Sequence, residues 1–262
     1  METTEWLKLY EWICSELEID PSEDLKAAAL MSSMIEGRCL SRQDVARLLV
    51  RHGWAVVFGA GPSLERDFKE FLQVVESGKL CTVAADGACR VFLENGLIPD
   101  VVVTDLDGGD EALMQAAAEG SLLVVHAHGD NIHKIRQLIP SISSKLLGTT
   151  QTEPVGVLEN FGGFTDGDRA VYMCEELGVK NIVVAGMDFE GAVGKHSKPY
   201  SMSEAELARK RKKLEIGKRL LTILAERTDS CLYDVSSNDS TIKGFVKTTW
   251  GSLMLQKTYL NR

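Results

Sequence analysis

Two aspartates separated by one residue, Asp105 and Asp107, are the side chains of this sequence best suited to metal-assisted chemistry. They follow a short apolar run, Val101–Val103, which is typical of a buried strand. Residues two apart in extended backbone point to the same side, so both carboxylates can converge on one cation. Carboxylate oxygens with room left for water and phosphate suit Mg²⁺ better than Zn²⁺. The alternative is a pair of helix-capping aspartates, because Asp110 then opens a helix with favourable dipole placement.

A glycine-rich turn that joins another apolar run to an amphipathic helix is suited to holding phosphate. Glycine lets the backbone approach a phosphate closely, and the new helix offers free N–H groups at its positive end. The turn lacks the Gly-Lys-Ser/Thr ending of a P-loop, and Asp67 stands where the dinucleotide fingerprint has a small residue. The alternative is a tight strand–helix turn without a ligand. The predicted phosphate-binding residues of this turn are Gly59, Gly61, Pro62 and Ser63.

Other polar residues follow later apolar runs. His126 and His128 favour contact with phosphate or substrate over metal ligation, because no third ligand stands close by. The predicted substrate-binding residues are Asp86, Gly163, Thr165, Asp166 and Asp188. Several of these side chains can equally be explained as helix caps. The basic run 209–213 can neutralise phosphate charge, although a charge run on a helix is usually a solvated face.

These residues are positioned by an alternation of short apolar runs and helical stretches that begins at about Trp54. Apolar strands separated by helices predict an α/β fold, a doubly wound, Rossmann-like, mostly parallel sheet with helices on both faces. Ligands bind such sheets at the carboxyl ends of the strands, where the polar residues stand. Residues 53–262 are predicted to form this catalytic domain, with a long C-terminal helix and terminal strands. Residues 1–52 are predicted to be a helical N-terminal segment with little chemistry, a cap or an oligomer contact.

Composition narrows the class of function. A formal net charge of −9 in 262 residues argues against a general nucleic-acid binder, which needs a cationic face. The N-terminus has no signal-peptide pattern, and the apolar runs are too short to cross a membrane. The six scattered cysteines are predicted to be reduced thiols. We therefore expect a cytoplasmic enzyme with small-molecule partners, no nucleic acid and no membrane; homo-oligomerisation stays open.

Several of these motifs, taken in order, resemble the archaeal 6-hydroxymethyl-7,8-dihydropterin pyrophosphokinases. The resemblance covers about 54–224 and includes Phe-Gly-Ala-Gly-Pro-Ser-Leu, Thr-Asp-Leu-Asp-Gly, His-Ala-His-Gly-Asp-Asn and Ala-Gly-Met-Asp-Phe. The chain is also similar to thiamin pyrophosphokinases, which commonly have Gly-Asp-x-Asp-Ser. Thr104 and Gly108 stand at the first and last positions of that motif here, which counts against thiamin as the substrate.

The resemblance implies transfer of pyrophosphate from ATP to the hydroxymethyl group of the pterin, with release of AMP. It implies Mg²⁺ as cofactor, held by Asp105 and Asp107, and a place in methanopterin or folate biosynthesis. Catalysis of this kind depends on positioning and electrostatics rather than on a covalent nucleophile. Two alternatives remain: a nucleotide-sugar glycosyltransferase resembling the longer motility accessory factors, and a non-catalytic nucleotide sensor.

Overall fold

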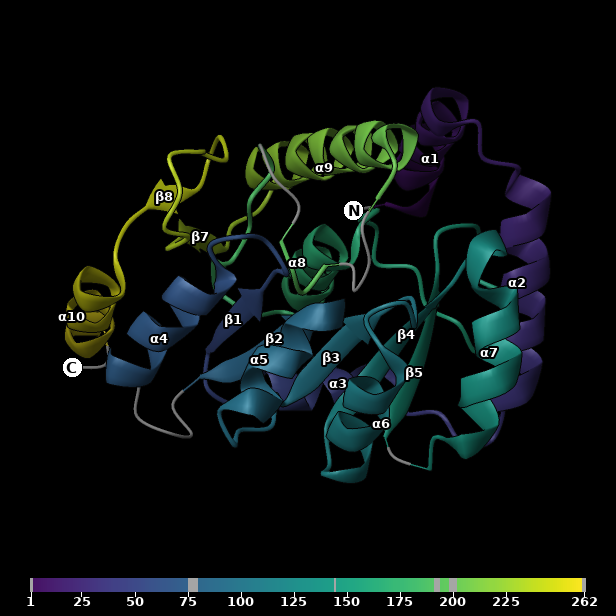
Figure 1. Ribbon diagram of the computed structural model, residues 1–262, viewed down its shortest axis with the longest axis horizontal. Helices are drawn as coiled ribbons and strands as arrows, with labels where there is room; N and C mark the ends of the chain where they lie inside the picture. The colour runs from purple at the N-terminus through teal and green to yellow at the C-terminus, as the bar shows by residue number, and fades with distance from the viewer. Residues whose placement is uncertain (1, 75–79, 144, 191–193, 198–201, 261–262) are drawn as a thin grey trace.

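The centre of the molecule is a parallel β-sheet (Figure 1). The computed structural model describes residues 2–74, 80–143, 145–190, 194–197 and 202–260. Neighbouring strands pair in parallel in the order β5-β4-β3-β2-β1-β6-β7-β8. The strands are β1 (Trp54–Phe58), β2 (Cys81–Ala85), β3 (Val101–Thr104), β4 (Leu122–Ala127), β5 (Leu146–Thr150), β6 (Asn181–Ala185), β7 (Cys231–Asp234) and β8 (Val246–Lys247). The predicted doubly wound, mostly parallel sheet is confirmed.

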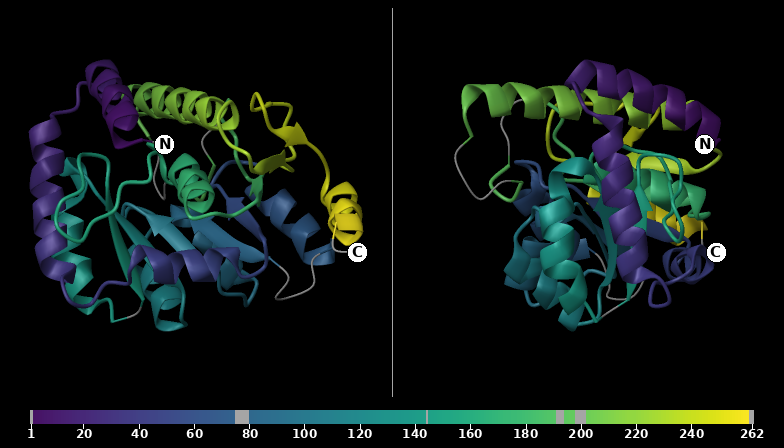
Figure 2. Two further views of the ribbon diagram at one scale, coloured as in Figure 1. Left: turned by 180° about the vertical axis from the view of Figure 1, so that it is seen from behind. Right: turned by 90° about the vertical axis from the view of Figure 1, so that its right-hand side faces the viewer.

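Both faces of the sheet are covered, which explains why the central strands are apolar throughout. In β1, Val56 and Phe58 face one hydrophobic cluster, whereas Ala55 and Val57 face the other. Helices α2 (Pro21–Ile35), α4 (Leu64–Val74), α5 (Cys89–Glu94), α6 (Asp110–Ala118), α7 (Ile132–Leu138) and α10 (Trp250–Leu260) contribute to the first cluster. Helices α1 (Thr3–Leu17), α3 (Arg42–Val50), α8 (Asp166–Glu176) and α9 (Glu204–Ala225) contribute to the second (Figure 2).

The first fifty residues form three helices that pack in the same two clusters as the strands. Asp20 caps α2 by accepting a hydrogen bond from the Ser22 amide, and Pro21 stands in the first turn of the helix. Ser41 forms a capping box with Asp44 at the start of α3. The division of the chain at residue 52 into two units stays a prediction. At the other end, the expected strands are short, and α10, which was not predicted, follows β8.

The chain begins the sheet at its centre, builds outward to β5, and then returns to place β6 beside β1. The strand order therefore reverses between β1 and β6, and ligands bind at such a switch point at the carboxyl ends of the strands. Figure 1 shows α9 and α1 lying above these strand ends. The carboxyl edge of the sheet is thus a roofed surface.

Candidate functional site

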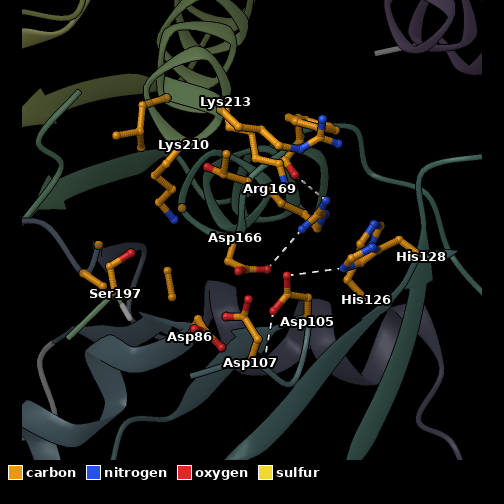
Figure 3. Close-up of a pocket in the computed structure, with 18 of the residues that line it drawn as sticks. Asp86, Asp105, Asp107, His126, His128, Asp166, Arg169, Ser197, Lys210 and Lys213 are labelled. Carbon is orange, nitrogen blue, oxygen red and sulfur yellow. Dashed lines mark hydrogen bonds and ion pairs between the residues drawn. The ribbon is translucent and has the colours of Figure 1, made fainter. Parts of the chain in front are cut away.

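A cleft of about 320 Å³ lies at the carboxyl edge of the sheet, beneath α9 (Figure 3). Its walls come from the segments that follow β1 to β6, from the first turn of α8, from α9, and from the corner between α1 and α2. Most of the predicted site residues line it: Gly59, Gly61, Pro62, Asp86, Asp105, Asp107, His126, His128, Thr165, Asp166 and Asp188. Ser63 and Gly163 are absent from the described lining.

Three carboxylates from two adjacent strands meet in this cleft. Asp86 follows β2, and Asp105 and Asp107 follow β3. One carboxylate oxygen from each of the three residues lies within 4.8 Å of the other two. Asp105 and Asp107 converge as predicted, but not through extended backbone. Leu106 between them has a φ of 72° and is fully buried, so the segment turns around an anchored leucine. The Asp107 amide donates to Oδ1 of Asp105 at 3.2 Å, which closes the turn.

Asp86 is the least solvated of the three. Its Oδ1 accepts hydrogen bonds from the Thr104 hydroxyl at 2.7 Å and from the Gly108 amide at 2.9 Å. Burial, together with the nearby charge of Asp105, raises the pKa of Asp86 well above its ordinary value. The structure groups Asp86 with the aspartate pair, and its predicted contact with substrate stays a prediction. Three crowded carboxylates fit a hard divalent cation, whose charge would remove their mutual repulsion.

A fourth carboxylate, Asp166, begins α8 and faces Asp105 across the cleft (Figure 3). Burial and then the negative charge of Asp105 raise the pKa of Asp166. The guanidinium of Arg169, whose Nη1 lies 3.1 Å from Oδ1 of Asp166, partly offsets this rise. Thr165 caps α8 through a capping box, with its hydroxyl bonded to Asp168. Gly163 adopts a φ of 80°, and a Cβ there would lie 2.4 Å from Cα of Arg169. Gly163 is therefore explained by backbone packing, and its predicted contact with substrate finds no support in the cleft lining.

The two histidines have different environments. His126 is 1% exposed; its Nδ1 lies 3.1 Å from the Thr149 hydroxyl, and its Nε2 has no hydrogen-bond partner among the described residues. Burial lowers the pKa of His126 well below its ordinary value, so the ring is neutral. Nδ1 of His128 accepts a hydrogen bond from the Asp130 amide, so the ring proton is on Nε2. Nε2 then donates a hydrogen bond to Oδ2 of Asp105 at 3.3 Å. His128 therefore orients one carboxylate of the cluster.

The glycine turn packs against the segment after β6. A Cβ on Gly59 would lie 2.7 Å from the Gly186 carbonyl oxygen, and one on Gly61 would lie 2.1 Å from a carboxylate oxygen of Asp188. The amide and hydroxyl of Ser63 both donate to Oδ2 of Asp188, at 3.0 and 2.7 Å. Close packing thus accounts for both glycines without a ligand. Ser63 faces Asp188, which explains why it is missing from the lining.

Helix α9 supplies cations to the roof of the cleft. Lys210 and Lys213 line it, and Figure 3 shows both above Asp166. The Nζ of Lys213 lies 5.9 Å from the centroid of the Phe164 ring, and burial lowers the pKa of Lys213. The expectation of a solvated basic face is therefore wrong for these two positions. It holds for Lys212 between them, which lies outside the lining and pairs with Glu16 at 2.8 Å.

The corner between α1 and α2 also lines the cleft, although no chemical role was predicted for this segment. Asp24, 2% exposed, accepts hydrogen bonds from the Tyr10 hydroxyl, the Gln151 side chain and the Gly129 amide, at 2.6, 2.6 and 2.7 Å. The indole of Trp6 donates to the Gln151 carbonyl at 2.7 Å. These bonds tie the N-terminal helices to the loops after β4 and β5. No sequence motif marks this contact.

Comparison with solved structures supports the fold. The structure of the MAf glycosyltransferase from Magnetospirillum magneticum superimposes on 91% of this chain with a TM-score of 0.55 and 16% identity. This chain spans 41% of the length of that protein. At this identity the similarity concerns the fold alone.

Among the described residues, no helix is long and apolar enough to span a bilayer.

Comparison with known sequences is more specific. The profile of the family described as 6-hydroxymethylpterin diphosphokinase MptE-like matches residues 39–192. A 6-hydroxymethyl-7,8-dihydropterin pyrophosphokinase of Methanothermobacter thermautotrophicus is 40% identical over 232 residues, 87% of this chain and 97% of that protein. Proteins of the same name from Pyrococcus furiosus and Methanocaldococcus jannaschii are 40% and 34% identical, over 84% and 87% of this chain and 93% and 98% of their own lengths. The carboxylate cleft described above therefore lies in a chain that belongs to the 6-hydroxymethylpterin diphosphokinase family.

Proposed function

We propose that this protein transfers the terminal pyrophosphate of ATP to 6-hydroxymethyl-7,8-dihydropterin, in the biosynthesis of a methanopterin- or folate-type cofactor. The observation that supports this most directly is the cluster of Asp86, Asp105 and Asp107, in a roofed cleft of a chain from this family. In the reaction, the hydroxymethyl oxygen forms a bond to the β-phosphorus and passes its proton to solvent. The bond from the β-phosphorus to the α,β-bridging oxygen breaks, and AMP leaves with that oxygen.

Asp86, Asp105 and Asp107 would hold Mg²⁺. When bound, the ion supplies charge neutralisation to the phosphate oxygens. Asp86 is oriented by Thr104 and Gly108, and Asp105 by His128, so the chain holds the carboxylates in place before substrate arrives. Such preorganised groups lower the barrier without reorganising during the reaction.

Arg169, Lys210 and Lys213 are three of the four described cations that line the cleft and could face the phosphates; the fourth, Arg209, donates to the Leu17 carbonyl. Lys213 is partly withdrawn from water beside Phe164, where its attraction for phosphate is screened less than at the surface. The glycine turn, through Gly59, Gly61 and Pro62, forms the wall beside the β1–β6 switch point. Helix α9 covers the cleft, which limits the access of water that would otherwise accept the pyrophosphate.

The test is incubation of the protein with ATP, Mg²⁺ and 6-hydroxymethyl-7,8-dihydropterin, with thiamin as the comparison acceptor. Chromatography with mass detection should show AMP and diphosphorylated pterin appearing in equal amounts, with no product from thiamin. Formation of ADP, or no turnover with the pterin, would contradict the proposed reaction. Omission of Mg²⁺ should stop turnover and its return should restore it.

A further inference from the structure

The order of the strands gives the cleft two ends, one on each side of the carboxylate cluster. His126 and His128 follow β4, the cluster follows β3 and β2, and the glycine turn follows β1 beside β6. The distance across the sheet from β4 to β1 is three strand spacings, which is roughly 14 Å at the usual separation of neighbouring strands. We call these the β4–β5 end and the β1–β6 end. In-line transfer needs the acceptor and the leaving nucleotide on opposite sides of the phosphorus, so each end suits one substrate.

The β4–β5 end is closed by the corner between α1 and α2. Glu18, Ile19 and Asp20 line it from this corner, opposite Asp130 from the loop after β4. The position of the corner is fixed by Asp24, which accepts hydrogen bonds from Gln151 and Gly129. Arg209 of α9 adds a further tie by donating to the Leu17 carbonyl at 2.7 Å. These hydrogen bonds hold the corner in place as a wall of the cleft.

Two chemical features distinguish this end. Its rim holds the exposed carboxylates of Glu18, Asp20 and Asp130, which can accept hydrogen bonds and which repel phosphate. One cation, Arg209, lies beside these three carboxylates, with its guanidinium bonded to the Leu17 carbonyl. The half-buried side chain of Ile19 adds an apolar surface at this corner. Nε2 of His126, a buried ring atom without a partner among the described residues, also belongs to this part of the lining. A buried polar atom with no partner is costly unless a ligand or a water completes it.

We propose that the β4–β5 end binds the aminopyrimidinone ring of the acceptor, and that the nucleoside of ATP occupies the β1–β6 end. This inference rests on the proposed function. The edge of a dihydropterin presents N–H donors at N2, N3 and N8, whereas adenine presents one amino group among ring acceptors. An acceptor-rich rim beside an apolar surface therefore matches the pterin better than adenine. The carboxylates of the rim also keep the triphosphate away from this end.

The test is the double variant Glu18→Gln/Asp20→Asn, which removes two rim charges while keeping shape, because asparagine also caps helices well. The matched control is Glu11→Gln/Glu16→Gln, which makes the same charge change on exposed positions of α1 outside the cleft. Steady-state kinetics should show the KM for the pterin rising about tenfold, as expected for lost charge-assisted hydrogen bonds. The KM for ATP should change by less than about twofold, and the control should match the wild type.

A second readout uses the 2-oxo analogue, 6-hydroxymethyl-7,8-dihydrolumazine, as acceptor. The wild type should prefer the 2-amino pterin by about tenfold or more in kcat/KM, and the double variant should lose most of this preference. A fold-level disturbance would weaken both acceptors equally. An unchanged KM for the pterin, or a rise confined to the KM for ATP, would overturn the assignment of the two ends. No turnover of pterin by the wild type would instead overturn the proposed function, and the assignment with it.

Discussion

The amide and the hydroxyl of Ser63 both donate to one carboxylate oxygen of Asp188, at 3.0 and 2.7 Å. The other oxygen of Asp188 accepts a hydrogen bond from the Asn238 side chain at 2.8 Å. The Ser63 amide, which precedes α4 and was predicted to bind phosphate, therefore already donates its hydrogen bond to a carboxylate of the chain. The pair links the turn after β1 to the turn after β6, across the switch point of the sheet.

We expect Asp188→Ala to lower the free energy of unfolding by about 2 kcal/mol, because it leaves two donors of Ser63 without their partner. Ser63→Ala should cost about 1 kcal/mol, since the backbone donor remains bonded. In the double variant the loss should be smaller than the sum, because the two residues share one interaction. Urea unfolding of the four proteins measures this coupling; strictly additive losses would show that the contact contributes no stability.

Asp86→Asn, Asp105→Asn and Asp107→Asn should each reduce kcat with ATP and pterin at least about a hundredfold, by analogy with the loss of other preorganised charge-stabilising groups. Each asparagine keeps the size of the side chain, so the fold should persist, as checked by circular dichroism. Asp110→Asn is the matched control, because Asp110 begins α6 and pairs with Lys134 outside the cleft. Near-wild-type rates in the three cluster variants would remove the metal-binding role proposed for them.

The carboxylate cluster predicts a pH-dependent stability that Mg²⁺ should reverse. The pKa values of Asp86 and Asp166 are raised in the folded protein by burial and by the charge of Asp105. The stability that these groups contribute is fully present below the ordinary aspartate pKa of about 4, and it is lost as pH rises through their folded pKa values. Melting temperatures measured in chelator from pH 4 upward should therefore show a fall that is smaller in Asp86→Asn.

At neutral pH, Mg²⁺ should raise the melting temperature of the wild type, because a ligand that binds the folded state stabilises it. This rise should be smaller at low pH, where protons compete for the carboxylates, and largely absent in Asp86→Asn. The same rise with Mg²⁺ in the wild type and in Asp86→Asn would argue that the ion acts elsewhere on the protein.

Lys213→Met should weaken catalysis with ATP by about tenfold to a hundredfold, because it removes a cation from the roof of the cleft. The methionine keeps the apolar contact with Phe164, so the packing of α9 should be preserved. Lys212→Met, one residue away, is a strict control: its ion pair with Glu16 is exposed, and its loss should cost little. Equal effects of the two substitutions on kcat/KM for ATP would contradict the role proposed for Lys213.

Strand-end placement could be predicted from the sequence, because an apolar run followed by Asp, Gly or His already indicates the carboxyl edge of a parallel sheet. Asp105 and Asp107 were found in this way, and so was the glycine turn. The turn at Leu106 could not be predicted, because its left-handed backbone depends on the buried position of that leucine. The sequence predicted Asp86 to be a separate substrate contact, because only the pairing of β2 with β3 places it beside the aspartate pair.

The roof and the far wall of the cleft could not be predicted from local patterns. Helical periodicity places Lys210 and Lys213 on one face of α9, but only tertiary packing decides that this face meets the strand ends. The corner at Glu18–Asp24 has the composition of an ordinary helix junction, and its contacts with Gln151 and Gly129 join residues more than a hundred positions apart. Such long-range contacts leave no signal in the local sequence.

The bond from the Trp6 indole to the Gln151 carbonyl gives the protein a built-in optical probe. Gln151 lines the cleft, whereas the other three tryptophans are remote from that bond. Trp12 packs on the same face of the sheet as Trp6 but lies under the guanidinium of Arg219, and Trp54 and Trp250 lie in the hydrophobic cluster on the opposite face. Indole emission depends on the hydrogen bonding and polarity around the ring, so we expect a molecule that enters beside Gln151 to change the light emitted by Trp6. Occupancy of the β4–β5 end can then be followed by fluorescence titration of the unlabelled protein.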